Sequence, residues 1–166
     1  MKALVVVATR HGGTREIGEV VAQTLVEHGI PCDVCSPDDV PGLDGYDAVI
    51  VGSPIYTGRW LPEARDFADQ CAPQLRERKV WLFSSGLSDA PAKASNRPAE
   101  TLERMDATGA IGHRHFPGRL DLNVLTFAER AIIAAARGKQ GDRRDMEVVR
   151  AWADQIAADV LAAASA

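Results

Sequence analysis

Short runs of consecutive apolar residues alternate with helical patterns along most of this chain. Residues 3–8 form the first run, and residues 47–52 and 79–84 repeat it. Runs of this length without polar interruption are typical of strands that are buried on both faces. A weaker strand is predicted over 31–36, and the last strand over 111–120.

Amphipathic helices are predicted between these strands. The first ends at Gly29, a common helix stop, and the second begins at Pro62 and continues through Leu75. Asp142 and Asp145 resemble a capping box before a final helix. The inner face of that helix is expected to consist of Met146, Val149, Trp152, Ala153, Ile156 and Val160. Buried strands that alternate with helices indicate an α/β domain with a parallel sheet covered on both faces, and we expect one domain over residues 1–166.

An extra segment, residues 121–141, separates the last strand from the final helix. Residues 124–137 have a broad apolar arc at helical spacing, and Ile133 falls inside the opposite, polar stripe. Basic residues gather at this end of the chain, namely Arg130, Arg137, Lys139, Arg143 and Arg144. Two interpretations remain open, a helix packed on its own domain and a weak peripheral contact with an anionic membrane surface.

The amino-acid composition and charge argue against several classes of protein. The chain has 166 residues, of which 46% are hydrophobic and 25% charged, enough for one buried core. The formal charge of −4 argues against a nucleic-acid partner, because such proteins usually carry a basic stripe. No apolar run approaches the roughly 20 residues that span a bilayer, and the N-terminus lacks the pattern of a signal peptide. With three cysteines, which cannot all pair, we expect a reducing, cytoplasmic location.

Two pairs of potential ligands have ordinary explanations. Cys32 and Cys35 have redox spacing, but residues three apart on a strand point to opposite faces, so structural thiols are expected. His113 and His115 share one strand face without nearby acids, which favours a packing role over a metal site. We therefore expect no metal.

The turn after the first strand has the composition of an anion cradle. It reads Thr9-Arg10-His11-Gly12-Gly13-Thr14, with Arg15 next. Glycines let backbone N–H groups approach an anion, the start of a helix supplies positive potential, and the two threonines supply hydroxyl donors. The turn lacks the Lys-Ser/Thr pair of a Walker loop and the glycine spacing of a dinucleotide fingerprint. The alternative is a glycine-containing turn without a ligand.

Two further loops leave strands that end at the same edge of the predicted sheet. The first contains Ser53, Pro54, Ile55, Tyr56, Thr57 and Gly58, followed by Arg59 and Trp60. An aromatic residue between glycines suits a flat ring that stacks on one face and accepts backbone hydrogen bonds along its edge. The second contains Ser85, Gly86 and Leu87. Ligands of open parallel sheets bind at the carboxyl ends of the strands, where all three loops meet.

Together the three loops resemble the flavodoxin-like fold, over nearly the whole chain. The first is similar to the phosphate loop of flavodoxins, with His11 where a third hydroxyl is usual, and the other two match the loops that flank the isoalloxazine ring. Three blocks resemble the flavodoxin-domain branch that includes menaquinone-dependent protoporphyrinogen dehydrogenases. They are 52–56, 116–121 and 141–145, the last followed by Arg150-Ala151-Trp152-Ala153.

The resemblance implies a three-layer sandwich with a five-stranded parallel sheet in the order 2-1-3-4-5 and a helical insertion before the last helix. It also implies FMN as cofactor and an oxidoreductase that passes electrons between an organic substrate, such as protoporphyrinogen, and a quinone-type acceptor. The flavin supplies the redox chemistry, so no catalytic side chain is assigned. Arg10, Arg15 and Arg59 beside the site favour a small acidic or aromatic substrate. Alternatives are an electron carrier for protein partners and a flavin-free scaffold or regulator; a homodimer is also left open.

Overall fold

The computed structural model describes residues 1–56, 58–86, 99–117, 119–120, 141–142 and 144–164. Its centre is a parallel sheet in the order β2-β1-β3-β5-β6. These five strands span Ala3–Val7 (β1), Cys32–Cys35 (β2), Ala48–Tyr56 (β3), Lys79–Gly86 (β5) and Gly112–Pro117 (β6). Counted along the chain, this is the predicted order 2-1-3-4-5. Parallel pairing in register, for example Val5 opposite Ile50, brings the carboxyl ends of all five strands to one edge.

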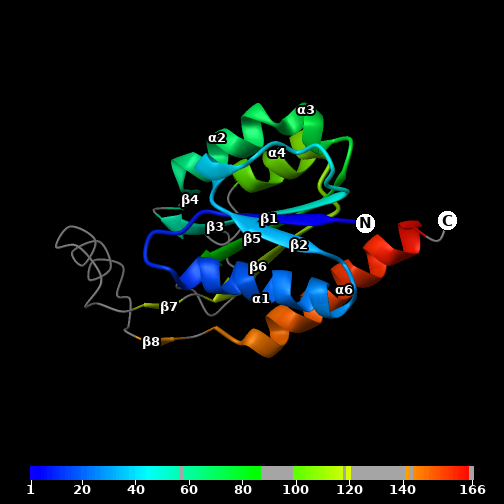
Figure 1. Cartoon of the computed structure of the whole chain (residues 1–166). Coiled ribbons are helices and arrows are strands. Elements are labelled where there is room, and N and C mark those ends of the chain that lie inside the picture. Colours follow the sequence, from blue (N-terminus) through cyan, green and yellow to red (C-terminus); the bar gives the residue numbers. More distant parts are fainter. Residues whose placement is uncertain (57, 87–98, 118, 121–140, 143, 165–166) are drawn as a thin grey trace.

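Helices cover both faces of this sheet (Figure 1). One face is covered by α1 (Gly13–Glu27) and α6 (Met146–Ala164), which lie side by side. The other face is covered by α2 (Pro62–Gln70), α3 (Ala72–Leu75) and α4 (Ala99–Thr108). The connection from β2 to β3 contains a single turn of 3-10 helix, η1 (Pro37–Asp39), where parallel crossovers commonly carry an α-helix.

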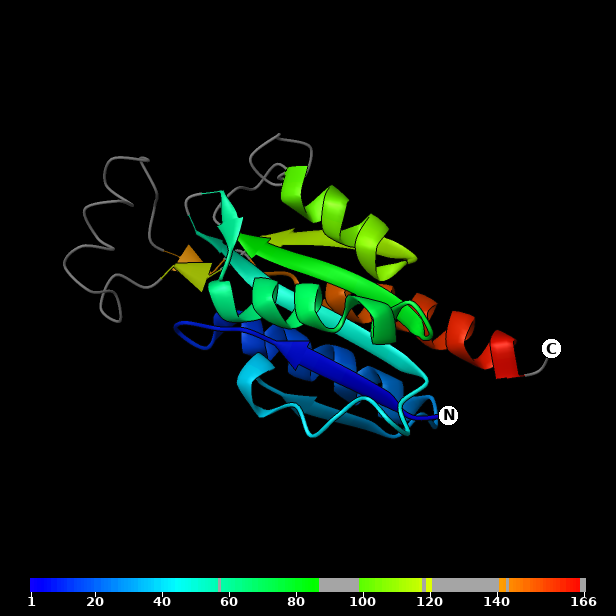
Figure 2. The same cartoon turned by 90° about the horizontal axis from the view of Figure 1, so that it is seen from above.

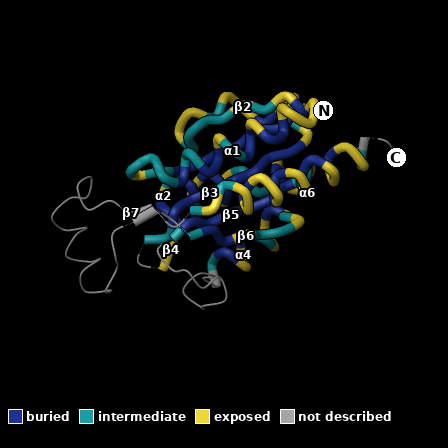
Figure 3. The backbone as a smooth tube through the Cα atoms, turned by 90° about the horizontal axis from the view of Figure 1, so that it is seen from below, coloured by how far each residue is buried: buried dark blue, intermediate teal, exposed yellow. Residues whose placement is uncertain are grey.

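The apolar positions predicted from periodicity form the two cores. Residues 3–8 are buried throughout, and alternate residues of β1 face opposite sides. Phe83, Phe116 and Trp152 meet edge to face under α1 and α6, with ring centroids 5.4–6.1 Å apart. Val149, Trp152, Ala153, Ile156 and Val160 are buried as predicted, and Met146 packs against the same cluster. In Figure 3 the central strands are mostly buried, whereas exposed residues lie on the helices and in the connections between elements.

Several predicted boundaries were wrong. The predicted strand 47–52 continues to Tyr56, where it turns back into β4 (Arg59–Trp60) and forms an antiparallel hairpin. The predicted last strand, 111–120, is two strands, because β7 (Arg119–Leu120) leaves the main sheet and pairs with β8 (Gly141–Asp142). The predicted helix 62–75 is interrupted at Cys71, so that α2 and α3 are separate.

The predicted capping box is half correct. Asp145 Oδ1 accepts the backbone N–H groups of Glu147 and Val148 at 3.0 and 3.4 Å, which caps α6. Asp142 lies in β8 instead. The helix α4 was not predicted. The insertion helix predicted over 124–137 lies outside the described residues.

The cysteines are free thiols, as expected. Cys32 packs against the core under α1 and Cys35 against the opposite core, so the two side chains face opposite sides of β2. Burial raises the pKa of Cys32 to about 12, which keeps this thiol protonated and unreactive near neutral pH. Among the described helices, none has the length and apolar character needed to cross a membrane.

Candidate functional site

The turn between β1 and α1 has the geometry of an anion cradle. Thr9 Oγ1 accepts the N–H of Gly12 at 2.9 Å and closes a tight turn around Arg10 and His11. Gly12 is the N-cap of α1, with φ of 85°, a left-handed conformation that glycine adopts without strain. Because Gly12 has no side chain to cap the helix, the N–H groups of the first turn are left for a ligand.

The third predicted loop is tied to this cradle. Thr14, at the start of α1, shares a hydrogen bond of 2.8 Å with Ser85 at the end of β5, and both side chains are buried. Gly86 follows, where an added Cβ would come within 3.1 Å of the His115 ring. Gly86 is the last residue of β5 and pairs with Pro117 of β6, and the nearby His115 ring makes this a position that suits glycine. Leu87 lies outside the described residues.

The second predicted loop is a hairpin rather than an open loop. Ile55 and Tyr56 pair with Trp60 and Arg59, and Gly58 turns the chain with φ of 77°. The Ser53 hydroxyl is buried inside the hairpin, where it accepts the N–H of Leu61 at 2.9 Å and donates to the carbonyl of Pro54. Ser53 thus shapes the hairpin from within. Thr57, at its tip, lies outside the described residues.

A stacked pair joins the first and second loops. The guanidinium carbon of Arg10 lies 4.7 Å from the centroid of the Tyr56 ring, a cation–π distance. His11, next to Arg10, is half-buried. One face of the Tyr56 ring is therefore in contact with Arg10. All three loops lie at the end of the sheet where β4 turns back and α1 begins (Figure 2).

A buried polar chain beneath the second loop was missed in the sequence. The Trp60 indole Nε1 donates to Ser84 Oγ at 2.7 Å, and Ser84 Oγ is 2.8 Å from His113 Nε2. The Arg104 guanidinium covers the Trp60 ring at 5.5 Å. This chain connects the hairpin to β5 and β6 and gives His113 the packing role expected of it. The alternation of side chains along a strand predicts which face of β5 or β6 each residue lies on. It does not predict which side chains of different strands meet.

Arg144 is a second residue that the sequence did not assign to the site. Its guanidinium donates to the Gly13 carbonyl at 3.2 Å and to Glu16 at 2.5 Å, and its side chain is only 7% exposed. Arg144 is therefore not available to a membrane surface, contrary to the prediction from its place among the basic residues. Its charge is instead buried against the first turn of α1.

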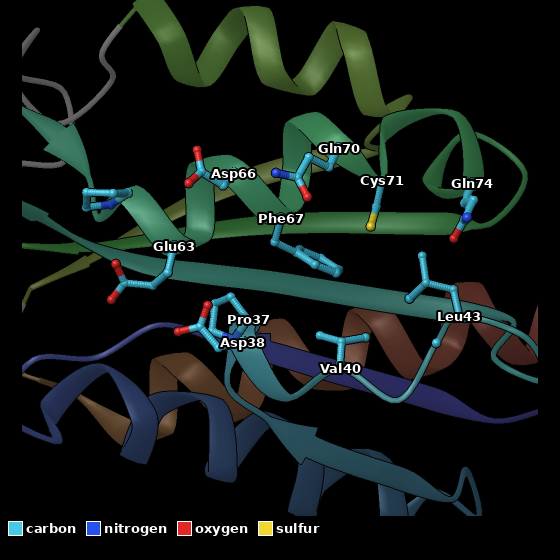
Figure 4. Close-up of a pocket in the computed structure, with 12 residues that line it drawn as sticks. Pro37, Asp38, Val40, Leu43, Glu63, Asp66, Phe67, Gln70, Cys71 and Gln74 are labelled. Carbon is cyan, nitrogen blue, oxygen red and sulfur yellow. The ribbon is translucent and has the colours of Figure 1, made fainter.

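The groove in Figure 4, of about 570 Å³, is lined by none of the predicted site residues. It lies between the η1 connection and α2. Phe67, Val40 and Leu43 form its apolar part, and Asp38, Glu63 and Asp66 add negative charge. The loop cluster is therefore a different place from this groove.

Comparison with known proteins decides the family. The model of the family described as flavodoxin domain matches residues 4–147, most of the chain. The chain belongs to the flavodoxin domain family. Solved structures agree on the fold: a flavodoxin from the domain Archaea superposes with a TM-score of 0.67 at 18% identity, over 96% of this chain and 99% of that one.

Curated relatives match about half of this chain and about half of their own length. Protoporphyrinogen IX dehydrogenase [quinone] of Escherichia coli K12 is 33% identical over 89 residues, which cover 52% of this chain and 49% of that protein. Probable flavodoxin 1 of Bacillus subtilis 168 is also 33% identical over 89 residues, covering 51% of this chain and 56% of that protein. The chain is thus similar to an enzyme and to a flavodoxin at the same level of identity.

Family membership identifies the cofactor as FMN, and the residues at the carboxyl edge fit it. An anion would complete the first turn of α1, since Gly12 leaves its N–H groups without a side-chain cap. The described residues provide a single helix start with this glycine geometry at that edge, Gly12, and a single cradle suits a mononucleotide with one phosphate. Gly58 turns the hairpin of the second loop with a positive φ, and no atom lies within 4 Å of the position that a Cβ would take there.

Proposed function

We propose that this flavodoxin domain is an FMN-dependent oxidoreductase that passes electrons between an organic substrate and a quinone-type acceptor. The observation that carries the proposal is the joining of all three loops at one edge. Thr14 binds Ser85 across the first and third loops, and Arg10 stacks on Tyr56 across the first and second. A ligand seated there contacts every predicted loop.

In this proposal the cradle holds the FMN phosphate. The N–H groups of Gly13 and Thr14 donate to it, because helix geometry leaves them without partners in the helix. The Thr9 oxygen already accepts from Gly12, so its hydroxyl hydrogen remains to donate to the phosphate. The backbone of residues 9–14 and the Thr9 hydroxyl thereby bind the charged end of the cofactor by hydrogen bonds and helix potential.

The other two loops orient the ring. We assign Pro54, Ile55, Tyr56, Thr57 and Gly58 to one side of it, with Ser53 holding the hairpin in shape, and Ser85, Gly86 and Leu87 to the other side. The Trp60–Ser84–His113 chain holds the hairpin against β5 and β6 from below. When bound, FMN supplies the electron-transfer chemistry. The chain's own contribution is binding, orientation and exclusion of water.

The alternative is an electron carrier whose partners are proteins. The acidic groove beside α2 favours it, because charged surfaces steer protein partners. The side chains at the loop cluster are different: Arg10, Arg59 and Arg15 stand there, and two of these are paired with glutamates. The remaining positive charge, that of Arg10, suits a small anionic or aromatic substrate better than a basic partner protein.

A single-turnover experiment separates the two functions. FMN-loaded protein is photoreduced without oxygen and mixed with 2-methyl-1,4-naphthoquinone or with cytochrome c, and free reduced FMN is the control. We expect saturable oxidation by the quinone, faster than that of free reduced FMN, and slow oxidation by cytochrome c. Saturable oxidation by cytochrome c, with the quinone no faster than for free FMN, would favour the carrier.

The organic donor is a finer part of the proposal. The name of the Escherichia coli relative makes protoporphyrinogen the first donor to test, and porphyrin fluorescence reports its oxidation.

Peripheral membrane contact through residues 124–137 stays a prediction. It now rests on Arg130, Arg137, Lys139 and Arg143 without Arg144, and sedimentation with anionic vesicles at low salt tests it.

A further inference from the structure

Arg10 occupies a position between the first two loops that the cofactor's phosphate does not require. The Thr9–Gly12 turn places Arg10 at its tip, where the residue is exposed. The guanidinium stacks on Tyr56, the last residue of β3, at 4.7 Å. An arginine on an exposed turn normally samples many conformations, whereas a ring beneath it restricts the guanidinium to one plane.

The charge of Arg10 is not neutralised by a carboxylate, unlike that of its neighbours. Arg15 pairs with Glu19 at 3.1 Å, Arg59 with Glu100 at 2.5 Å, and Arg144 with Glu16. Arg10 has no ion pair within the parts of the chain that the structure describes. In a chain with a net charge of −4, an uncompensated cation at the rim of the site attracts anions locally.

The contact with Tyr56 leaves the N–H donors of the Arg10 guanidinium available to a ligand. Arg10 lies over the Tyr56 ring and makes no ion pair within the described part of the chain, so its N–H donors are available to an anion. Two parallel N–H groups match the two oxygens of a carboxylate. A neutral quinone offers no such group. The stacked pair therefore distinguishes a carboxylated substrate from an uncharged one.

We propose that Arg10, held in place by Tyr56, determines specificity by binding the carboxylate of an aromatic or other flat-ringed organic acid. The proposal rests on the proposed function, because it places this substrate beside bound FMN. It assigns the Arg10 side chain to the substrate, whereas the backbone of the same turn holds the phosphate. Tyr56 is a positioning residue for that guanidinium.

The test compares an acid with its ester on the FMN-loaded protein. Anthraquinone-2-carboxylate and its methyl ester share one ring system and differ in charge, and the change in the flavin absorbance on titration gives each dissociation constant. We expect the unmodified protein to bind the acid at least about tenfold more tightly than the ester, the effect of one charge-assisted pair. R10Q should bring this ratio close to one.

Matched variants separate Arg10 from general charge and from structure. R15Q also removes one arginine from this edge, but one already paired with Glu19, so the acid-to-ester ratio should stay as in the unmodified protein. R10K keeps the charge and loses the flat fork, and an intermediate ratio is expected. Y56F keeps the ring and should keep the ratio, whereas Y56L should reduce it.

The outcomes also distinguish this proposal from the proposed function. Loss of the acid preference in R10Q that still binds FMN at one site per chain supports the assignment. Bound FMN with equal affinity for acid and ester, or an unchanged preference in R10Q, overturns it and leaves the proposed function intact. Failure of the unmodified protein to bind FMN overturns both.

Discussion

Glycines at two positions determine how closely the backbone can approach other groups. Gly12 allows the left-handed turn that opens the first turn of α1 to an anion. Gly52 lies beneath the Phe83 ring, where an added Cβ would be 2.1 Å from the nearest ring atom. Each glycine is thus required for a different reason, a backbone angle at residue 12 and space at residue 52.

Substitutions in the cradle should weaken FMN binding. Gly12→Asp brings a negative side chain to the phosphate, and Thr14→Ala removes the hydroxyl that binds Ser85. Repulsion of a size similar to one charge-assisted hydrogen bond, about 1.5–3 kcal/mol, should raise the dissociation constant of Gly12→Asp by roughly ten- to a hundredfold. Thr14→Ala loses a neutral hydrogen bond of about 0.5–1.5 kcal/mol, so its dissociation constant should rise by roughly two- to tenfold. Fluorescence titration with FMN measures this.

The controls for the cradle are Gly12→Ala, which adds backbone strain without charge, and Thr14→Ser, which keeps the hydroxyl. Both should bind FMN more tightly than the corresponding test variant. If Gly12→Asp and Thr14→Ala titrate like the unmodified protein, the turn is not a phosphate site.

Gly52→Ala should destabilise the fold. The Phe83 ring cannot move freely, because Phe116 and Trp152 pack against it. Overpacking of this kind costs about 1–3 kcal/mol, visible as a lower midpoint of urea unfolding. Gly112→Ala is the matched control, since its Cβ would meet the nearest atom at 3.9 Å. Equal midpoints for the two variants would contradict the close approach at Gly52.

At the scale of helices and strands, the periodicity of apolar residues predicted the elements that form from local sequence. The five parallel strands were predicted from apolar runs and the intervening helices, and their order from the resemblance to flavodoxin-like proteins. The strand β4 has two residues and exists through its pairing with Ile55 and Tyr56, so no run of residues announces it. The helix α2 ends at Gln70, with Cys71 as its C-cap, although apolar residues continue at helical spacing. The spacing of apolar residues does not show where the backbone leaves the helical conformation.

Side-chain contacts between different helices and strands could not be predicted from the sequence either. Arg144 and Glu16 are 128 positions apart, and Thr14 and Ser85 are 71 apart. The sequence could place these residues at one edge of the sheet, but their partners depend on side-chain packing. For this reason Arg144 was interpreted as a surface cation when it is buried.

The Arg144 ion pair should hold α6 against the cradle. Arg144→Met removes its bonds to Glu16 and to the Gly13 carbonyl. Glu16 is half-exposed and stays hydrated, so the loss should fall toward the lower end of the about 1.5–3 kcal/mol typical of hydrogen bonds to charged groups. The free energy of unfolding measures this, and FMN affinity should fall with it.

Arg150→Met is the control on the same two helices. Arg150 meets Glu27 at 3.4 Å with both side chains about half-exposed, and exposed pairs contribute about 0–1 kcal/mol. A loss for Arg150→Met as large as that for Arg144→Met would mean that burial of the Arg144 pair has no special role.

At the scale of the whole molecule, the fold separates stability from chemistry. The two cores lie within the three layers, whereas the loops that are free to carry function leave the sheet at its carboxyl edge. Negative charge gathers in the groove beside α2, and the unpaired charge of Arg10 stands at the loop cluster. This arrangement directs an anionic cofactor and an anionic substrate to one place in an acidic protein.

The central claim is that the turn over residues 9–14 binds the phosphate of FMN. Calorimetric titration of the flavin-free protein with FMN and with riboflavin, which has the same ring and no phosphate, tests it most directly. Several hydrogen bonds to the phosphate, each about 1.5–3 kcal/mol, predict that FMN binds at least about a hundredfold more tightly at one site per chain. Equal affinity for FMN and riboflavin would contradict the account.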